Sequence, residues 1–407
     1  MSRQLEVVTP EGAAGLLVKE SQHVFSYRSA DPATEVSLSM PLKAASYNSN
    51  PLHPAFAMNL PEGFLLDRLR SRLGKFGKLD DMRLLEHTGR RQIGRLQYLA
   101  EPGGWETPRA TATLQQLLDE GNRKGIFDYL VETYLEAGIA GVQPKVLLPD
   151  GSRQPADGDR ATVIQPDLIV KAAGSDYEGL AANEFACMSA ARRAQIDTPE
   201  FWLSDDDTLF VMRRFDLDPG RRGFEDIATV AALRTGSDDG YKYKGSYEAV
   251  AAVIATYAGP GRAVALEQFF DYVVLSVMVR NGDAHLKNFG LTYSTPQAGD
   301  VELAPLFDVV TTTIYTYPSP KTGESLVDRT MALKLMKRDK NQRYPVRSEI
   351  IEFGRKVCGV ARPEESIDRI ATAVRTTMGE ELRRVPDSIR GDMAAAWNEG
   401  LSTLATA

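Results

Sequence analysis

The sequence predicts an α+β fold with an N-terminal strand-rich subdomain, a second region of strands around one helix, and a helical C-terminal lobe. Short runs of alternating apolar and polar residues, separated by Pro and Gly turns, dominate the first half of the chain. Helical periodicity dominates the second half. At roughly 100 to 200 residues per domain, a chain of 407 residues accommodates two or three domains.

The composition is that of a folded protein without a membrane span. Hydrophobic residues make up 43% of the chain and charged residues 25%, close to the globular average. No apolar run approaches the ~20 residues that cross a bilayer, and the N-terminus lacks a secretory signal. The net charge of -7 argues against a surface built mainly for nucleic acid. Because only two cysteines are present, a disulfide framework is excluded, and we expect a cytoplasmic location.

Residues 1–105 predict a small subdomain made mostly of strands. The alternation of residues 35–40 is typical of a strand, and one helical stretch is expected around residues 63–73. Pro102-Gly103-Gly104 marks a linker, which places the domain boundary near residue 105.

Residues 106–218 predict a lobe of strands around one helix. Asp150-Gly151 supplies a hairpin turn between its first two strands. The predicted elements are a helix over residues 114–135, strands over 145–148, 161–164 and 167–171, a helix over 183–196 and a strand over 208–213.

Residues 219–407 predict a helical lobe, with helices over residues 247–257, 265–280, 349–357 and 364–378. A strand-rich lobe with one helix, followed by a helix-rich lobe, is the order that a protein-kinase-like bilobed fold requires. A fold alone proves no activity.

The segment 281–289, Asn-Gly-Asp-Ala-His-Leu-Lys-Asn-Phe, has the highest density of reactive groups. Phosphoryl transfer needs a carboxylate that accepts the proton of the substrate hydroxyl and, a few residues on, an oxygen ligand for Mg²⁺. Asp283 and Asn288 have this spacing. The alternative is a solvated loop, in which Asn, Gly and Asp are frequent for conformational reasons.

Three further residues are candidates for the same chemistry. Asp308, embedded in apolar residues, is a candidate second metal ligand, because Mg²⁺ prefers carboxylate oxygen; the alternative is a helix cap. His285 could contact a phosphate or orient Asp283, or it could be a structural histidine. Lys287 is a further catalytic candidate in this segment. The remaining histidines show no zinc-ligand spacing.

Candidates for nucleotide binding lie upstream. Gly141 and Val142 precede a predicted strand, where backbone N–H groups could approach phosphates. Lys171 ends a strand and Glu184 opens the next helix, the order of a lysine and a helix glutamate that hold ATP phosphates. The alternative for this pair is a surface lysine and a glutamate favoured by the helix dipole.

Two further candidates are a strand end that could meet adenine and a run of basic residues. Arg213 and Phe215 lie at a strand end, where a hinge would offer backbone groups to adenine. The run 329–347 holds seven basic residues and one acid; it is either a solvated face or a nucleic-acid contact.

Several motifs, taken in order, resemble the HipA family of bacterial toxin-antitoxin serine/threonine kinases, and they cover nearly the whole chain. These motifs are Asn59-Leu60-Pro61-Glu62-Gly63, Gly141-Val142-Gln143-Pro144-Lys145, Lys171, Asn183-Glu184-Phe185, Arg214-Phe215-Asp216, the segment 281–289 and Leu303-Ala304-Pro305-Leu306-Phe307-Asp308.

The resemblance implies ATP and Mg²⁺ as cofactors. It also implies a protein substrate with a target serine or threonine, a translation component such as an aminoacyl-tRNA synthetase. A small HipB-like helix-turn-helix antitoxin would hold the kinase and supply most of the contact with operator DNA. The roles carried over are Asp283 as catalytic base, Asn288 and Asp308 as metal ligands, Lys171 and His285 beside the ATP phosphates, and Arg213 to Phe215 beside the adenine.

One position departs from many relatives. Gly138 stands where they carry a serine whose autophosphorylation inactivates the kinase, so that control cannot operate at this place. Two other functions stay open from the sequence: a non-catalytic regulator that binds ATP or an antitoxin, and a small-molecule phosphotransferase.

Overall fold

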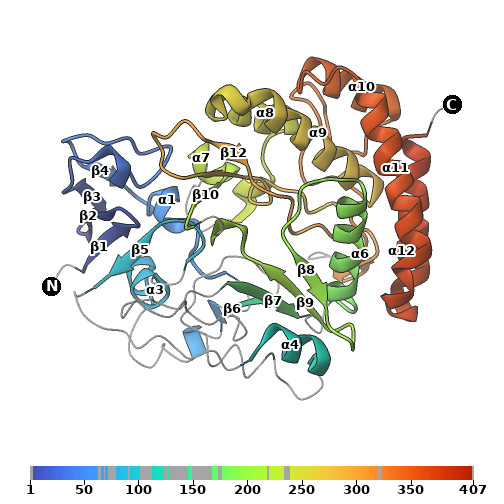
Figure 1. Ribbon diagram of the computed structural model, residues 1–407, viewed down its shortest axis with the longest axis horizontal. Coiled ribbons are helices and arrows are strands. Elements are labelled where there is room, and N and C mark those ends of the chain that lie inside the picture. Colours follow the sequence, from blue (N-terminus) through green and yellow to red (C-terminus); the bar gives the residue numbers. More distant parts are fainter. Residues whose placement is uncertain are drawn as a thin grey trace. The chain divides into compact units, whose positions relative to one another are not determined.

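We describe the protein from a computed structural model, shown in Figure 1. The chain divides into two units. The first draws on residues 1–174, 200–238 and 292–298, and the second on residues 175–199, 239–291 and 299–407. The structure describes residues 3–62, 66–67, 69–71, 79–89, 92–100, 112–122, 127, 145–148, 167–172, 177–217, 220–232, 239–318 and 323–405. Within these ranges, no helix combines the length and the apolarity that a bilayer span requires.

The first unit opens with a five-stranded antiparallel sheet in the order β4-β3-β2-β1-β5 (Figure 1). Leu5 and Val7 are buried and alternate with less buried residues, so β1 presents one face to the core. Gly15 is required here because a Cβ would lie 2.9 Å from the ring of Phe25. The strands are β1 (Gln4–Thr9), β2 (Gly12–Lys19), β3 (His23–Tyr27), β4 (Tyr47–Ser49) and β5 (Gln97–Leu99).

The strand predicted over residues 35–40 is wrong, because this segment forms no strand. Its main-chain N–H groups bond to side chains or to nearby carbonyl oxygens instead of to a neighbouring strand. The Val36 N–H donates to the Tyr27 hydroxyl at 3.1 Å, and the Leu38 N–H donates to a carboxylate oxygen of Glu225 at 2.8 Å. Alternation alone could not reveal these distant acceptors.

A second antiparallel sheet in the first unit has the order β6-β7-β9-β8. Its strands are β6 (Lys145–Leu148), β7 (Leu168–Ala172), β8 (Phe201–Leu203) and β9 (Leu209–Arg213). Every residue of β6 and β7 is buried, which agrees with their mainly apolar sequence and includes one lysine in each strand, Lys145 and Lys171. The prediction is confirmed for three strands, and the one over residues 161–164 lies outside the described residues.

The remaining elements of the first unit are short. The predicted helix over residues 114–135 begins as α4, which opens with a capping box at Thr113 and ends at Gly121. Residues 66–67 and 69–71 are helical, within the stretch predicted at 63–73. The elements are α1 (Pro54–Ala57), α3 (Asp81–Thr88), α4 (Leu114–Glu120), β10 (Gly223–Asp226) and α7 (Ile227–Val230).

The second unit is mainly helical, as expected for the C-terminal lobe, but it also contains the helix predicted over residues 183–196, which the prediction placed in the lobe of residues 106–218 (Figure 1). The predicted bounds of α8 match residue for residue, whereas α6 begins three residues earlier than expected, after Gly179. One helix, α12, was not predicted. The helices are α6 (Leu180–Arg193), α8 (Tyr247–Tyr257), α9 (Arg262–Met278), α10 (Arg347–Lys356), α11 (Pro363–Glu380) and α12 (Asp387–Thr403). The short strands β12 (Glu302–Leu303), β13 (Tyr317–Pro318) and β14 (Ser325–Leu326) also belong to this unit, while β11 (Gly290–Tyr293) runs from the second unit into the first.

The helix α9 forms the core of the second unit and leads into the segment 281–289. Phe269, Val274 and Leu275 are fully buried. The helix α12 lies close against the end of α9, since a Cβ at Gly400 would lie 2.0 Å from the carbonyl oxygen of Met278. This packing fixes the point at which the chain leaves α9.

Candidate functional site

The segment 281–289 follows α9 as a tightly bonded loop. The Asn281 side-chain oxygen accepts the Asp283 N–H at 3.0 Å, and the Gly282 N–H donates to the Thr312 hydroxyl at 2.7 Å. A Cβ at Gly282 would lie 2.6 Å from the carbonyl oxygen of Thr330. Glycine is therefore required at this position because neighbouring segments approach its backbone closely.

Asp283 presents a carboxylate at the surface of this loop. Its side chain is 45% exposed, and its Oδ1 atom accepts the Tyr243 hydroxyl at 2.7 Å. The Nε2 atom of His285 lies 3.9 Å from the same oxygen. The side chain of Asp283 is therefore partly exposed, while the backbone of its loop is fixed.

His285 is buried beside Asp283. Burial lowers the pKa of His285 to about 4, because the imidazolium loses hydration; the charges of Asp283 and Asp308 oppose this shift, and those of Lys242 and Lys287 strengthen it. The ring is therefore neutral at neutral pH. Its Nδ1 atom has no hydrogen-bond partner among the described residues.

Asn288 joins the loop to the segment that holds Asp308. The Asn288 Nδ2 group donates to the carbonyl oxygen of Asp308 at 3.3 Å. The amide oxygen of Asn288 is buried and has no hydrogen-bond partner among the described residues. Asn288 is therefore not part of a solvated loop, which was the alternative for it.

The helix cap considered for Asp308 is wrong, because no helix begins there. Asp308 has a left-handed φ of 60°, which is uncommon for a residue other than glycine. No group of three or more His, Cys, Asp and Glu side chains in the described part of the chain is placed to hold a metal ion. Mg²⁺ needs fewer protein ligands than such a group supplies, because it keeps water and phosphate oxygens, so the buried amide oxygen of Asn288, on a side chain bonded to the backbone of Asp308, is compatible with this ion.

The sequence analysis names the residue that anchors the Asp308 segment within a family motif but predicts no role for it. The side chain of Asn183, buried in α6, accepts the Thr311 N–H at 2.8 Å and donates to the Thr311 carbonyl at 2.9 Å. The Trp397 indole of α12 donates to the Thr311 hydroxyl at 2.7 Å. A lone asparagine in an alanine-rich apolar helix was the available signal, because a buried amide requires partners.

Tyr243 was also missed. It belongs to a 3-10 helix, Asp239–Tyr243, that lies forty residues before Asp283 in the chain. No spacing or motif connects the two positions, so only the tertiary structure brings the hydroxyl to the carboxylate.

Lys171 and Glu184 lie in different units and are both buried. Lys171 lies in β7, and Glu184 lies in the second turn of α6. The alternative of a surface lysine with a first-turn glutamate is wrong for both, because neither side chain reaches solvent.

Arg213 and Phe215 lie at the end of β9, as predicted. The Arg213 side chain bonds to Glu200 at 2.9 Å and to Asp167 at 3.4 Å. The ring of Phe215 packs edge-on against Phe224 at 5.4 Å between centroids. These side chains are engaged locally, and the backbone N–H groups of Arg213 and Arg214 donate to the carbonyl oxygens of Glu200 and Asp167 at 2.8 and 2.9 Å.

Lys287 is half-buried within the loop. Gly138, Gly141 and Val142 lie outside the described residues.

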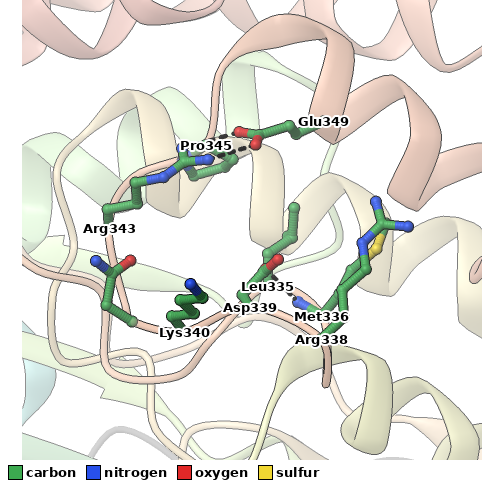
Figure 2. Close-up of a pocket in the computed structure, with 9 residues that line it drawn as sticks. Leu335, Met336, Arg338, Asp339, Lys340, Arg343, Pro345 and Glu349 are labelled. Atoms are coloured by element: carbon green, nitrogen blue, oxygen red, sulfur yellow. Dashed lines mark hydrogen bonds and ion pairs between the residues drawn. The ribbon is translucent and has the colours of Figure 1, made fainter.

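The basic run 329–347 borders a pocket of about 420 Å³ beside α10 (Figure 2). Figure 2 shows the guanidinium of Arg343 paired directly with the carboxylate of Glu349, and both residues line the pocket. All four arginines of the run are paired with acids: Arg329 with Glu399, Arg338 with Glu352, Arg343 with Glu349 and Arg347 with Asp368. Because these acids neutralise the arginines, the run favours the solvated face over a nucleic-acid contact.

The fold and the two joined loops define a protein of the kinase-like α+β class. Residues 5–99 match the family described as the HipA N-terminal domain, and residues 137–381 match the HipA-like C-terminal domain. The second match covers more than half of the chain, so the chain belongs to the HipA family.

Relatives extend this comparison. The solved HipA of Shewanella oneidensis MR-1, in complex with HipB and operator DNA, matches with a TM-score of 0.69 and 18% identity over 98% of this chain and 96% of that chain, which shows the fold. Y4dM of Sinorhizobium fredii, named as a kinase, is 28% identical over 54% of this chain and 55% of its own length, about half of that relative. Y4mE of the same organism, also named as a kinase, is 27% identical over 70% of each chain.

Proposed function

We propose that this protein is an ATP- and Mg²⁺-dependent serine/threonine protein kinase that acts as a toxin. The observation that carries the proposal is that Asn288 joins the loop of Asp283 to the segment of Asp308. This loop presents the partly exposed carboxylate of Asp283. It also holds the buried amide oxygen of Asn288, which has no hydrogen-bond partner among the described residues. Family membership and the kinase names of relatives support it.

In this proposal Asp283 orients the substrate hydroxyl and accepts its proton. Lys287 and the neutral ring of His285 flank Asp283. Asn288 and Asp308 would hold Mg²⁺, which neutralises charge on the transferring phosphoryl group when it is bound. The nucleotide would be held by Lys171, Glu184 and the loop at Gly141 and Val142, with its adenine at the backbone of Arg213 to Phe215.

The proposal extends to partners. The solved relative was determined as a complex with HipB and operator DNA, which supports a HipB-like antitoxin for this chain that also carries most of the DNA contact. The substrate would be a serine or threonine of a translation component, such as an aminoacyl-tRNA synthetase. Both cysteines are buried and unpaired, which agrees with a cytoplasmic location.

The test is transfer of labelled γ-phosphate from Mg-ATP to proteins of a bacterial lysate. Asp283→Asn is expected to lower the rate about 10²- to 10⁴-fold, because the base and its orientation are lost. Asp392→Asn is a matched control, since Asp392 is exposed on α12. Mass spectrometry of the labelled band identifies the substrate.

Asp308→Asn separates metal binding from catalysis. We expect it to weaken the Mg²⁺ dependence of ATP binding, measured by calorimetry with and without the ion, because a neutral amide attracts the cation less than a carboxylate. Full transfer activity in both Asp283→Asn and Asp308→Asn would contradict the proposal. A wild-type protein that binds ATP but transfers no phosphate would also contradict it.

A further inference from the structure

The two carboxylate oxygens of Asp283 have different surroundings. The Oδ1 atom accepts the Tyr243 hydroxyl at 2.7 Å and faces the Nε2 atom of His285 at 3.9 Å. The Oδ2 atom accepts no hydrogen bond from any residue that the structure describes. Since each carboxylate oxygen can accept two hydrogen bonds, the bond from Tyr243 leaves Oδ2 open to a further donor.

Tyr243 is itself held in place by the fold. The carbonyl oxygen of the preceding residue, the buried Lys242, accepts the Leu286 N–H at 3.1 Å, which joins the 3-10 helix to the loop of Asp283. The ring of Tyr243 packs edge-on against the His285 ring, with 5.1 Å between centroids. The hydroxyl is thus presented to Asp283 from a fixed backbone and a packed ring.

A carboxylate that is 45% exposed would rotate about its side-chain bonds without such a partner. A hydroxyl bonded to one oxygen selects one rotamer and directs the other oxygen outward. Reaction rates depend steeply on such alignment, and a misplacement of about 1 Å can cost roughly 10²-fold in rate.

We infer that Tyr243 is a positioning residue for phosphoryl transfer: its hydroxyl holds Oδ1 of Asp283 so that Oδ2 receives the substrate hydroxyl. This inference rests on the proposed role of Asp283 as the base. It assigns to the 3-10 helix Asp239–Tyr243 a part in catalysis, although no atom of that helix takes part in the bond changes.

The test is Tyr243→Phe, which removes the hydroxyl and keeps the ring that packs on His285. The readouts are kcat and the KM for ATP in the transfer of labelled γ-phosphate, together with the thermal unfolding midpoint. We expect kcat to fall about 10- to 100-fold, with the KM for ATP and the unfolding midpoint unchanged. Tyr317→Phe, an exposed tyrosine in β13, is the matched control.

A second measurement distinguishes positioning from a general structural effect. In the Asp283→Asn background, single-turnover transfer should fall by no more than about twofold when Tyr243→Phe is added, because residues that act as a unit are not additive. A further fall of tenfold or more would show that Tyr243 acts independently of Asp283 and would overturn the inference.

Other outcomes have separate meanings. Unchanged kcat in Tyr243→Phe, with an active wild-type protein, would overturn the inference and leave the proposed function intact. An increased kcat would also overturn it, because the hydroxyl would then compete with the substrate. An inactive wild-type protein would instead contradict the proposed function.

Discussion

His285 shows at the scale of one residue how burial controls charge. Burial lowers the pKa of His285 from 6.5 to about 4, so the folded protein disfavours its protonation relative to the unfolded chain. The stability that this residue contributes is therefore fully present above pH 6.5 and is lost as the pH falls through 4.

The prediction is that His285→Asn flattens the acid side of the stability curve. Relative to the variant, the wild-type protein should lose about 3 kcal/mol of unfolding free energy between neutral pH and pH 4, at 1.36 kcal/mol per pKa unit. Urea unfolding at several pH values measures this difference. Parallel curves for the two proteins would mean that the ring is protonated in the folded state as readily as in the unfolded chain.

At the scale of one element, α12 offers two glycines with opposite surroundings. A Cβ at Gly400 would lie 2.0 Å from the Met278 carbonyl oxygen at the end of α9, whereas a Cβ at Gly391 would meet nothing within 4 Å. Both glycines lie inside the same helix, so their replacement by alanine changes helix propensity alike and differs only in packing.

We expect Gly400→Ala to destabilise the second unit by about 1–3 kcal/mol, because α12 must move away from α9. Gly391→Ala should stabilise it by about 0.5–1 kcal/mol through helix propensity. Thermal unfolding of both variants measures the contrast. Equal effects of the two substitutions would show that the contact between α12 and α9 is not close.

At the scale of the whole molecule, the N-terminal residues contribute to the interior of the first unit. The carboxylate of Glu225 accepts the Ser37 hydroxyl at 2.6 Å and the Leu38 N–H at 2.8 Å. The carboxylate of Asp216 accepts the Gly94 N–H at 2.7 Å. Both acids are buried, and although Arg214 and Tyr293 also donate to them, part of their hydrogen bonding depends on residues 1–105.

We propose a domain boundary near residue 105. We predict that residues 106–407 alone do not fold cooperatively, because without the N-terminal residues both buried acids lose these hydrogen-bond donors. Circular dichroism and thermal unfolding of this fragment test the prediction, and coexpression with residues 1–105 should restore the transition. A sharp transition for the fragment alone, at the full-length midpoint, would contradict it.

Local periodicity was sufficient for several strands and for most of the long helices. The bounds of α8 and β6 were predicted residue for residue, because apolar spacing and nearby turn residues act over a few positions. The order of strands and helices then indicated the kinase-like fold. The spacing within residues 281–289 indicated a functional loop, and the structure shows that the backbone of this loop is fixed by hydrogen bonds.

The tertiary structure alone revealed the features that depend on distant partners. Residues 35–40 alternate like a strand but bond to Glu225, 187 residues away from Leu38. Asn183 holds Thr311 across 128 residues, and Tyr243 reaches Asp283 across 40. Hydrogen bonds between side chains and a distant backbone or carboxylate leave no periodic trace in the sequence, so they become visible only when the chain is folded.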